Sequence, residues 1–169
     1  MGINADIRHE NVFQTSFSPS SFDVVYSNGV IEHFSDPRDL VRAHVTLLKP
    51  GGVAVIVIPN YGGLYGDIKR RLDPENLAIH NLAIMSEPAL LALAPSDGSC
   101  QARAYRYGRA SPWIISLQRR WGRAGLLLSW MLNFLSLALP LRIGALAPIF
   151  VLEIHREPAA TQAESRSGS

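Results

Sequence analysis

The sequence of 169 residues predicts an α/β protein built around parallel strands. Residues 22–27 are a short run of β-branched and aromatic residues bounded by turn residues, which is typical of a strand. Residues 53–58 are six apolar residues without alternation, which is typical of a strand buried on both faces and therefore parallel. Because helical periodicity lies between them, residues 22–58 are predicted to form a strand–helix–strand unit.

The helix of this unit is predicted to begin near Asp36. The carboxylate of Asp36 can cap the first turn, and Pro37 fits the first helical position. The turn at residues 50–52 (PGG) ends the helix. One helical face carries side chains suited to a core, namely Leu40, Val41, His44, Leu47 and Leu48.

Weaker patterns predict the remaining elements. In chain order these are a strand at 6–13, a glycine-rich loop at 59–66, a short helix from 86 to 95, a strand at 101–107, a mostly helical stretch at 112–139 and a last strand at 149–155. The polar, small residues 158–169 predict a disordered tail.

Composition and charge exclude several classes of protein. A hydrophobic content of 47% supplies one core, so the chain is neither disordered nor collagenous. The single Cys100 excludes an internal disulfide framework and an all-cysteine zinc site. The net charge of +2 hides an asymmetry, because residues 98–152 hold seven arginines and no acid. A block of this kind predicts an anionic partner for that segment.

The apolar run at residues 125–141 raises the question of a membrane. Its 17 uncharged residues are slightly fewer than the roughly 20 that a spanning helix needs, and Pro140 interrupts it. A buried or interface helix is the favoured interpretation, and a spanning helix is the alternative. The preceding arginines also allow a peripheral membrane contact through residues 119–152. The N-terminus has no secretory pattern, so we expect a cytoplasmic location with membrane association as an option.

Two segments follow the carboxyl ends of the predicted parallel strands, where ligands bind in open α/β sheets. They are residues 27–34 (SNGVIEHF) and residues 60–66. The first segment, followed by Asp36-Pro37 and by LLKPGG at residues 47–52, resembles the second half of a class I S-adenosylmethionine-dependent methyltransferase of the type 11-like group. In that family these motifs flank the fourth and fifth strands.

The resemblance implies an incomplete Rossmann-like sheet, with strands three to seven of the family and an extra helical apolar segment. It divides the chain into a partial methyltransferase core at 1–60, a substrate-side region at 61–157 and the tail at 158–169. It implies S-adenosylmethionine as the cofactor. The side chains expected at this cofactor are Asn11 and Val12 at the adenine, Ser27 and Asn28 at the methionine part, and Val30 beside them.

The resemblance places Asn60 and Tyr61 at the acceptor. His33 is the candidate catalytic residue, as a general base that removes an acceptor proton. A histidine that packs or hydrogen-bonds locally is the alternative. No metal is required by this chemistry, and the other histidines show no metal-ligand spacing in the sequence.

The implied function is methyl transfer to a small-molecule, lipid or glycan acceptor, with an anionic or lipid-linked acceptor preferred because of the basic segment. Nucleic acid is not an expected partner, because Asn28 is not followed by Pro-Pro and an aromatic residue. A non-catalytic remnant that binds a membrane or a partner protein is the first alternative. Another nucleotide-binding enzyme, such as a dehydrogenase, fits the two motifs less well.

The family's glycine-rich cofactor loop has no counterpart before residue 22. We therefore expect that this chain covers only part of the domain and that, by itself, it binds S-adenosylmethionine weakly. The missing half would come from residues upstream or from another chain. The Phe22–Ser27 strand would otherwise be an exposed apolar edge.

Overall fold

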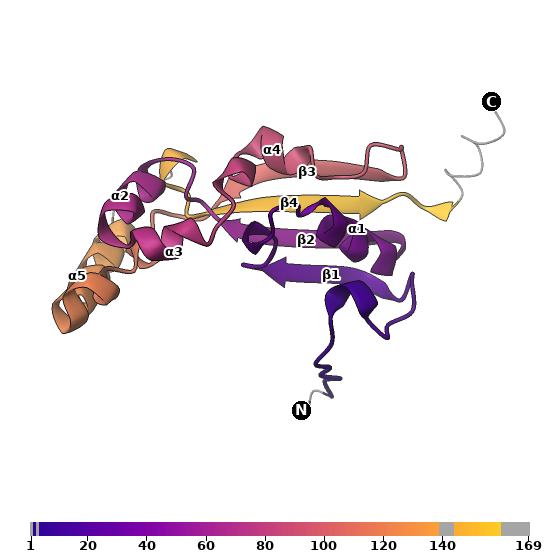
Figure 1. The fold of residues 1–169 in the computed structure, drawn as a ribbon, viewed down its shortest axis with the longest axis horizontal. Helices are drawn as coiled ribbons and strands as arrows, with labels where there is room; N and C mark the ends of the chain where they lie inside the picture. The colour runs from indigo at the N-terminus through magenta and orange to yellow at the C-terminus, as the bar shows by residue number, and fades with distance from the viewer. Residues whose placement is uncertain (1, 3, 139–143, 160–169) are drawn as a thin grey trace.

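A computed structural model, which describes residues 2, 4–138 and 144–159, contains a four-stranded mixed sheet with a helical extension at one end (Figure 1). The strands lie in the order β1-β2-β4-β3. β1 and β2 are parallel, whereas β4 is antiparallel to both β2 and β3. The predicted α/β class and the predicted parallel pair are therefore confirmed. The strand bounds are β1 (Phe22–Asn28), β2 (Leu48–Pro59), β3 (Cys100–Tyr107) and β4 (Ile149–Arg156).

Five α-helices and five short 3-10 helices connect the described strands. The α-helices are α1 (Arg38–Leu47), α2 (Leu64–Leu72), α3 (Pro74–Ala78), α4 (Glu87–Leu91) and α5 (Leu117–Ala138). The 3-10 helices are η1 (Val12–Gln14), η2 (Ile31–His33), η3 (Leu82–Ile84), η4 (Pro112–Ile115) and η5 (Gly144–Leu146).

The capping prediction for α1 holds within two residues. The Asp36 carboxylate accepts a hydrogen bond from the Arg38 backbone N–H at 3.1 Å, and α1 begins at Arg38. Its buried residues are Leu40, Val41 and His44, which belong to the predicted core face. Since α1 joins β1 to β2, burial of this face holds the parallel pair together.

The core lies between the sheet and the helices α1 and α4. Alternate residues of β2 point into it, and Ala54, Ile56 and Ile58 are at most 1% exposed. The neighbouring strand β4 contributes Phe150 and Leu152 to the same cluster. Burial of a large aliphatic side chain of this kind is worth about 1.5–3 kcal/mol.

The opposite face of the sheet is more open, which corrects the prediction that residues 53–58 are buried on both faces. Val53 and Val55 are half-buried, while Tyr26 on β1 and Tyr107 on β3 are 61% and 63% exposed. The difference arises because α1 and α4 both pack against the side that carries Ala54 and Ile56.

The strand predicted at residues 6–13 is absent from the described structure, so the fold holds four of the five predicted strands. The segment instead ends in η1, where the Asn11 side chain accepts a hydrogen bond from the Phe13 N–H. Contacts within the segment hold it, including Arg8 with Asp6 at 2.7 Å and Glu10 with the Ser16 N–H at 2.8 Å. A strand needs a partner to satisfy its backbone groups, and none of the described strands pairs with this segment.

Two loop predictions also change. The LKPGG segment belongs to β2 as an irregular strand start, because the register shifts between Phe22 and Val24 opposite it and Gly51 has a φ of +80°. The loop at residues 59–66 is shorter than predicted, because α2 begins at Leu64.

The predicted helical stretch at 112–139 corresponds to η4 and α5, with a break at Gly122, where φ is 54° and ψ is −128°. Residues 139–143, at the end of the apolar run, and residues 160–169 of the predicted tail lie outside the described residues. Within the described chain, no helix combines the length and the apolarity that crossing a bilayer requires.

Buried His44 predicts a pH dependence of folding stability. Burial lowers the pKa of His44, while its Nδ1, 2.7 Å from the Leu40 carbonyl oxygen, opposes that shift through a hydrogen bond. The unfolded chain takes up a proton near pH 6.5, at which the folded chain remains neutral. Stability is therefore full above that pH and falls below it.

Between about pH 7.5 and 5.0 the free energy of unfolding of the wild type should fall. In His44→Leu that fall should be smaller by on the order of 1 kcal/mol, as measured by urea unfolding. His9→Leu, at an exposed position, is the control. An equal loss in His44→Leu and in the wild type would show that His44 does not cause it.

Candidate functional site

The carboxyl ends of the two parallel strands meet at one edge of the sheet. Asn28 at the end of β1 lies beside Val57 of β2, and the Gly29 N–H donates to the Val57 carbonyl at 2.9 Å. The Ser27 Oγ is buried and has no hydrogen-bond partner among the described residues, whereas Asn28 is exposed. A hydroxyl and an amide that are both free to bond lie where ligands bind in open α/β sheets.

A hollow opens just beyond this edge, between η2 and the segment after α3. Four hydrogen bonds join the two sides of the hollow. The Asn81 N–H donates to the Glu32 carbonyl at 2.6 Å, and the Asn81 side-chain amide donates to the carbonyls of Phe34 and Ser35 at 3.0 and 3.2 Å. The fourth joins His33 Nδ1 to the Ile79 carbonyl at 3.1 Å. The lining residues are Glu32, His33, Phe34, Ser35, Ala78, Ile79, His80 and Asn81.

Three ionisable side chains converge in this hollow. One ligand atom from each of Glu32, His33 and His80 lies within 4.8 Å of the others. Glu32 is 1% exposed, and neither carboxylate oxygen has a hydrogen-bond partner among the described residues. Burial raises the pKa of Glu32, against smaller opposing effects of its own backbone N–H, which lies outside hydrogen-bonding geometry, and of His33.

A second group of side chains lies next to the hollow. The Tyr61 ring packs edge-on against His80 at 5.1 Å, and the Lys69 ammonium lies 5.2 Å from the centre of the same ring. Lys69 is 2% exposed and pairs with Asp73 at 3.5 Å. Burial lowers the pKa of Lys69, against the attraction of Asp73. The pKa of Tyr61 is raised by burial and by the charges of Glu32 and Asp73.

The predicted acceptor residues have different surroundings. The Asn60 amide donates to the Ala147 carbonyl at 2.8 Å and accepts from the Gly62 N–H at 3.2 Å, so it holds the start of the loop against η5. Tyr61 lies against His80, beside the hollow. Their roles toward an acceptor stay predictions.

The predicted cofactor residues fall into two groups. Ser27, Asn28 and Val30 lie together at the end of β1, where Val30 is 37% exposed. Asn11 caps η1 and Val12 is its first residue, so neither lies at a strand end, and the Asn11 side-chain oxygen accepts from the Phe13 N–H. The structure thus brings the first group together and leaves Asn11 and Val12 without a strand to present them.

The exposed ring of His33 fits both interpretations of that residue. Its Nδ1 bonds to the Ile79 carbonyl, and its ring packs on His80 at 4.7 Å between centroids, which is the local role. That bond leaves Nε2 free to accept a proton, which the catalytic role requires. The sequence missed His80, Asn81 and Lys69, because only the folding of α2 and α3 brings them to the sheet edge.

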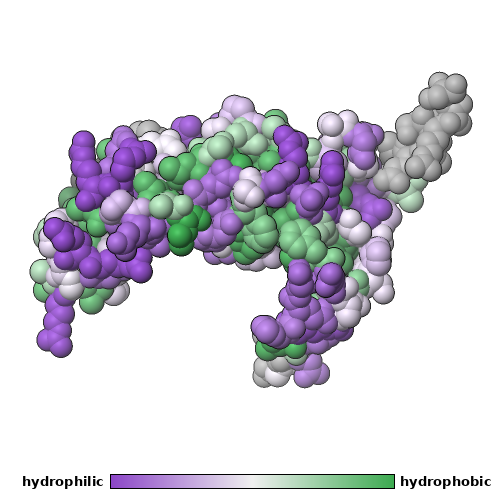
Figure 2. Space-filling model, viewed as in Figure 1, coloured by the Kyte–Doolittle hydropathy of each residue, from purple (hydrophilic) through white to green (hydrophobic). Residues whose placement is uncertain are grey.

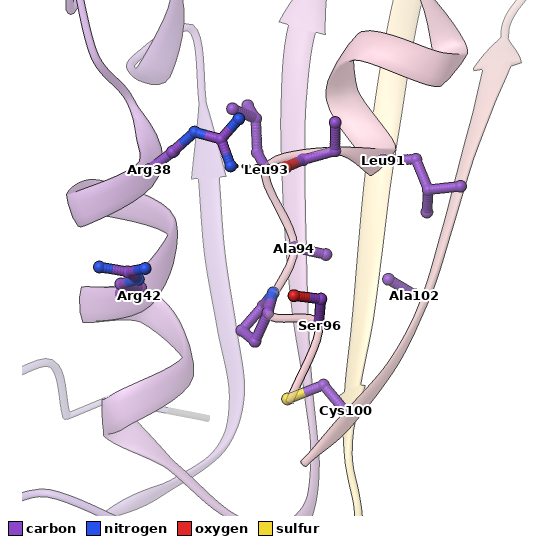
Figure 3. A pocket seen from close by; sticks show the side chains of 10 residues that line it. Arg38, Arg42, Leu91, Leu93, Ala94, Ser96, Cys100 and Ala102 are labelled. Carbon is purple, nitrogen blue, oxygen red and sulfur yellow. Dashed lines mark hydrogen bonds between the residues drawn. The ribbon is translucent and has the colours of Figure 1, made fainter. Parts of the chain in front are cut away.

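A separate groove lies on the helix-covered side (Figure 3), where Arg38 and Arg42 of α1 face the Leu91–Ser96 stretch and Cys100. In the sheet register, Cys100 of β3 lies opposite Arg156 of β4, and the adjacent His155 lies opposite Val53 of β2. This part of the groove is therefore at the opposite end of the sheet from Asn28. Burial raises the pKa of Cys100, which disfavours the reactive thiolate form.

Internal contacts use part of the basic segment. Arg103 pairs with Glu153 at 2.8 Å, Arg106 with Glu87 at 3.7 Å and Arg119 with Asp73 at 3.2 Å. Arg119 and Lys69 lower the pKa of Asp73, although burial by itself would raise it. Among the described contacts, none pairs Arg120 or Arg123 with an acid. Within the described part of the segment, Arg120 and Arg123 are therefore candidates for contact with an anionic partner.

Comparison with known proteins supports the fold and the family. A family model described as "Methyltransferase domain" matches residues 2–56. The ubiquinone biosynthesis O-methyltransferase of Ruegeria pomeroyi is 39% identical over 54 residues, which are 32% of this chain and 22% of that protein. A probable S-adenosylmethionine-dependent methyltransferase of Mycolicibacterium smegmatis is 40% identical over 55 residues, 32% of this chain and 21% of that protein. The matches thus span about a fifth of these relatives.

Among solved structures, phosphoethanolamine N-methyltransferase 2 of Haemonchus contortus in complex with S-adenosyl-L-methionine aligns with a TM-score of 0.51 and 18% identity. The alignment covers 88% of this chain and 36% of that one, and it supports the fold alone. Residues 2–56, which include the EHF and LKPGG motifs, are thus similar to S-adenosylmethionine-dependent methyltransferases. The name of the Mycolicibacterium smegmatis relative describes that protein as S-adenosylmethionine-dependent.

The two glycines at the start of α2 provide a test of how the hollow is supported. A methyl group on Gly66 would lie 2.0 Å from the Tyr61 carbonyl oxygen, whereas one on Gly63 would meet nothing within 4 Å. We expect Gly66→Ala to destabilise the fold by about 1–3 kcal/mol, because the backbone at Tyr61 must move. Gly63→Ala should change stability by no more than about 0.5 kcal/mol. Thermal unfolding followed by circular dichroism measures both, and equal effects would argue against this close contact.

Proposed function

We propose that this chain forms the acceptor side of an S-adenosylmethionine-dependent methyltransferase. The observation that carries the proposal is the convergence of two features at one sheet edge. Ser27 and Asn28 end β1 in the motif region shared with the family, and the hollow with Glu32, His33 and His80 opens directly beyond it. A cofactor site and an acceptor site must be adjacent for direct methyl transfer.

The residues present fit a polar cofactor at the end of β1. The buried Ser27 hydroxyl has no partner among the described residues, and an unpaired buried hydroxyl costs about 1–3 kcal/mol. The exposed Asn28 amide lies one residue further along, and Val30 adds an apolar contact. Ser27, Asn28 and Val30 would therefore hold the methionine part of S-adenosylmethionine.

The cofactor, when bound, supplies a methyl group that its positively charged sulfur activates. The protein's task is then to orient the acceptor, to exclude water and to accept a proton where the acceptor carries one. His33 is the candidate for that proton through Nε2, because its Nδ1 bonds to the Ile79 carbonyl. Tyr61 and His80 form an aromatic wall beside it.

The open side of the sheet supports the proposal that another segment completes the domain. β1 pairs only with β2 among the described strands, so its outer edge has free backbone groups. Tyr26 and Val24 on this strand are 61% and 58% exposed. A further strand and helices, from upstream residues or from another chain, would cover both surfaces and bring the rest of the cofactor site.

The surface of α5 favours an acceptor at a membrane. The helix buries Gly125 and Ser129 and presents its large apolar side chains outward, the reverse of an ordinary surface helix. The exposed side chains are Leu126, Leu127, Trp130, Met131, Phe134, Leu135 and Leu137, with exposed fractions from 39% to 74%. In Figure 2, hydrophobic (green) and hydrophilic (purple) surfaces mix at the left end of the molecule, where Figure 1 shows α5.

Arginines without acidic partners precede this apolar surface. Arg120 and Arg123 lie on α5 ahead of Leu126, so one helix offers both charge for anionic headgroups and apolar bulk for the acyl boundary. We propose that α5 lies on an anionic lipid surface and that the acceptor is small or lipid-linked. The alternative of a purely membrane-binding module uses the same surface without methyl transfer.

Binding of S-adenosylhomocysteine tests the cofactor assignment. We expect weak binding by this chain, with a Kd on the order of 1 mM or about −4 kcal/mol, because the contacts assigned to the cofactor come from the end of β1 only. Amide chemical shifts should move at Ser27, Asn28 and Val30 in nuclear magnetic resonance spectra.

Asn28→Ala should weaken this binding about fivefold, the value of one hydrogen bond, and Asn4→Ala should not change it. The absence of shifts at these amides up to about 5 mM would contradict the proposed function. Micromolar binding would contradict the expectation that the site is partial.

Vesicle flotation tests the lipid contact. We expect the chain to float with vesicles of phosphatidylcholine and phosphatidylglycerol, and Leu127→Glu with Phe134→Glu to lower this binding at least about tenfold. Ile7→Glu is the matched control, since Ile7 is 90% exposed outside α5. Arg120→Gln with Arg123→Gln should cost about 30-fold on the anionic vesicles, from about 1 kcal/mol per basic residue. No flotation, together with self-association, would assign the surface to a second copy instead.

A further inference from the structure

We propose that Glu32, His33 and His80 bind a divalent cation of the zinc class. The three residues come from two segments, η2 and the turn after α3, which are separated by more than forty positions in the sequence. One ligand atom of each nevertheless lies within 4.8 Å of the others. Two imidazoles and one carboxylate are a donor set that Zn²⁺ accepts.

The buried carboxylate of Glu32 is the observation that points to a ligand. It is 1% exposed and lines the hollow, and both of its oxygens lack a hydrogen-bond partner among the described residues. A carboxylate in this environment is costly unless a cation pairs with it. Lys69, the buried cation nearby, is paired with Asp73 instead.

Both imidazoles make a backbone hydrogen bond of the kind that metal-binding histidines usually make. His33 Nδ1 lies 3.1 Å from the Ile79 carbonyl oxygen, and His80 Nδ1 lies 2.7 Å from the Asn76 carbonyl oxygen. A carbonyl can only accept, so each Nδ1 carries its hydrogen and each Nε2 keeps a lone pair. Such backbone bonds to the second ring nitrogen fix the tautomer and the ring orientation of metal-bound histidines.

The geometry leaves room for a small closure and for a fourth ligand. Donors around a tetrahedral Zn²⁺ at 2.0–2.1 Å are roughly 3.4 Å apart, so the three side chains need to approach by about 1 Å. His33 is exposed and can supply that movement. Ser35 and Ala78 in the lining of the hollow are exposed, so a water or an acceptor oxygen can reach the fourth position.

This site changes the expected chemistry of the acceptor. A hydroxyl bound to the cation would lose its proton to solvent water more readily than a free hydroxyl, so His33 would act as a ligand and no protein base would be needed. The sequence predicted no metal, because His33 and His80 are far apart along the chain and lack a ligand spacing. The metal-binding claim stands without the proposed methyl transfer.

Zinc titration of the chain tests the proposal. The purified chain is treated with a chelator and titrated with Zn²⁺ in competition with a chromogenic chelator, and Co²⁺ absorption reports the ligand geometry. We expect one Zn²⁺ per chain with a Kd at or below about 10 µM, and at least about tenfold weaker binding in His33→Gln, His80→Gln and Glu32→Gln.

His9→Gln, at an exposed position outside the hollow, is the control and should bind as the wild type does. Circular dichroism checks that each variant folds, and the exposed His33 variant keeps the test valid if Glu32→Gln does not fold. Wild-type binding weaker than about 100 µM, or unchanged binding in both folded histidine variants, would overturn the proposal. Since the readout is metal binding, that failure would leave the methyltransferase proposal standing.

Discussion

The parallel pairing of β1 with β2 is the constraint on which the rest of this structure depends. Parallel strands joined by one helix must both end at the same edge of the sheet. Asn28 therefore ends β1 beside Val57 near the end of β2, although the two residues are 29 positions apart in the sequence. The ion pair of Lys49 with Asp23 at 2.8 Å joins the other end of the pair, where β2 is irregular.

The site above this edge depends on a second segment that covers it. Residues 79–81 bond to residues 32–35, and Asn81 provides three of the four bonds that join them. This cover is what buries Glu32 and brings His80 against His33. The hollow is therefore a property of the contact between the family-like core and the region after residue 61, and neither part forms it without the other.

The strands and helices that the sequence predicted well are those with strong local patterns. The run at 22–27 and the capped helix from Asp36 carry their own signals, so β1 and α1 were placed to within two residues. Residues 6–13 have a strand-like composition, but a strand also needs a neighbour, which local composition does not report. The contact of His33 with His80 could not be predicted from local sequence for a similar reason, because it depends on how α2 and α3 pack near the sheet edge.

The two faces of the sheet differ in how far helices bury them. The side that carries Ile56 and Leu152 is closed by α1 and α4 and forms the core. The other side exposes Tyr26 and Tyr107, and the outer edge of β1 is unpaired among the described strands. Parallel strands are ordinarily covered on both faces, because their backbone pairing is weaker and their side chains are apolar on both sides. The hollow is lined from η2 and the segment after α3, whereas the open surfaces follow β1, so a segment that covers β1 would not have to rearrange the hollow.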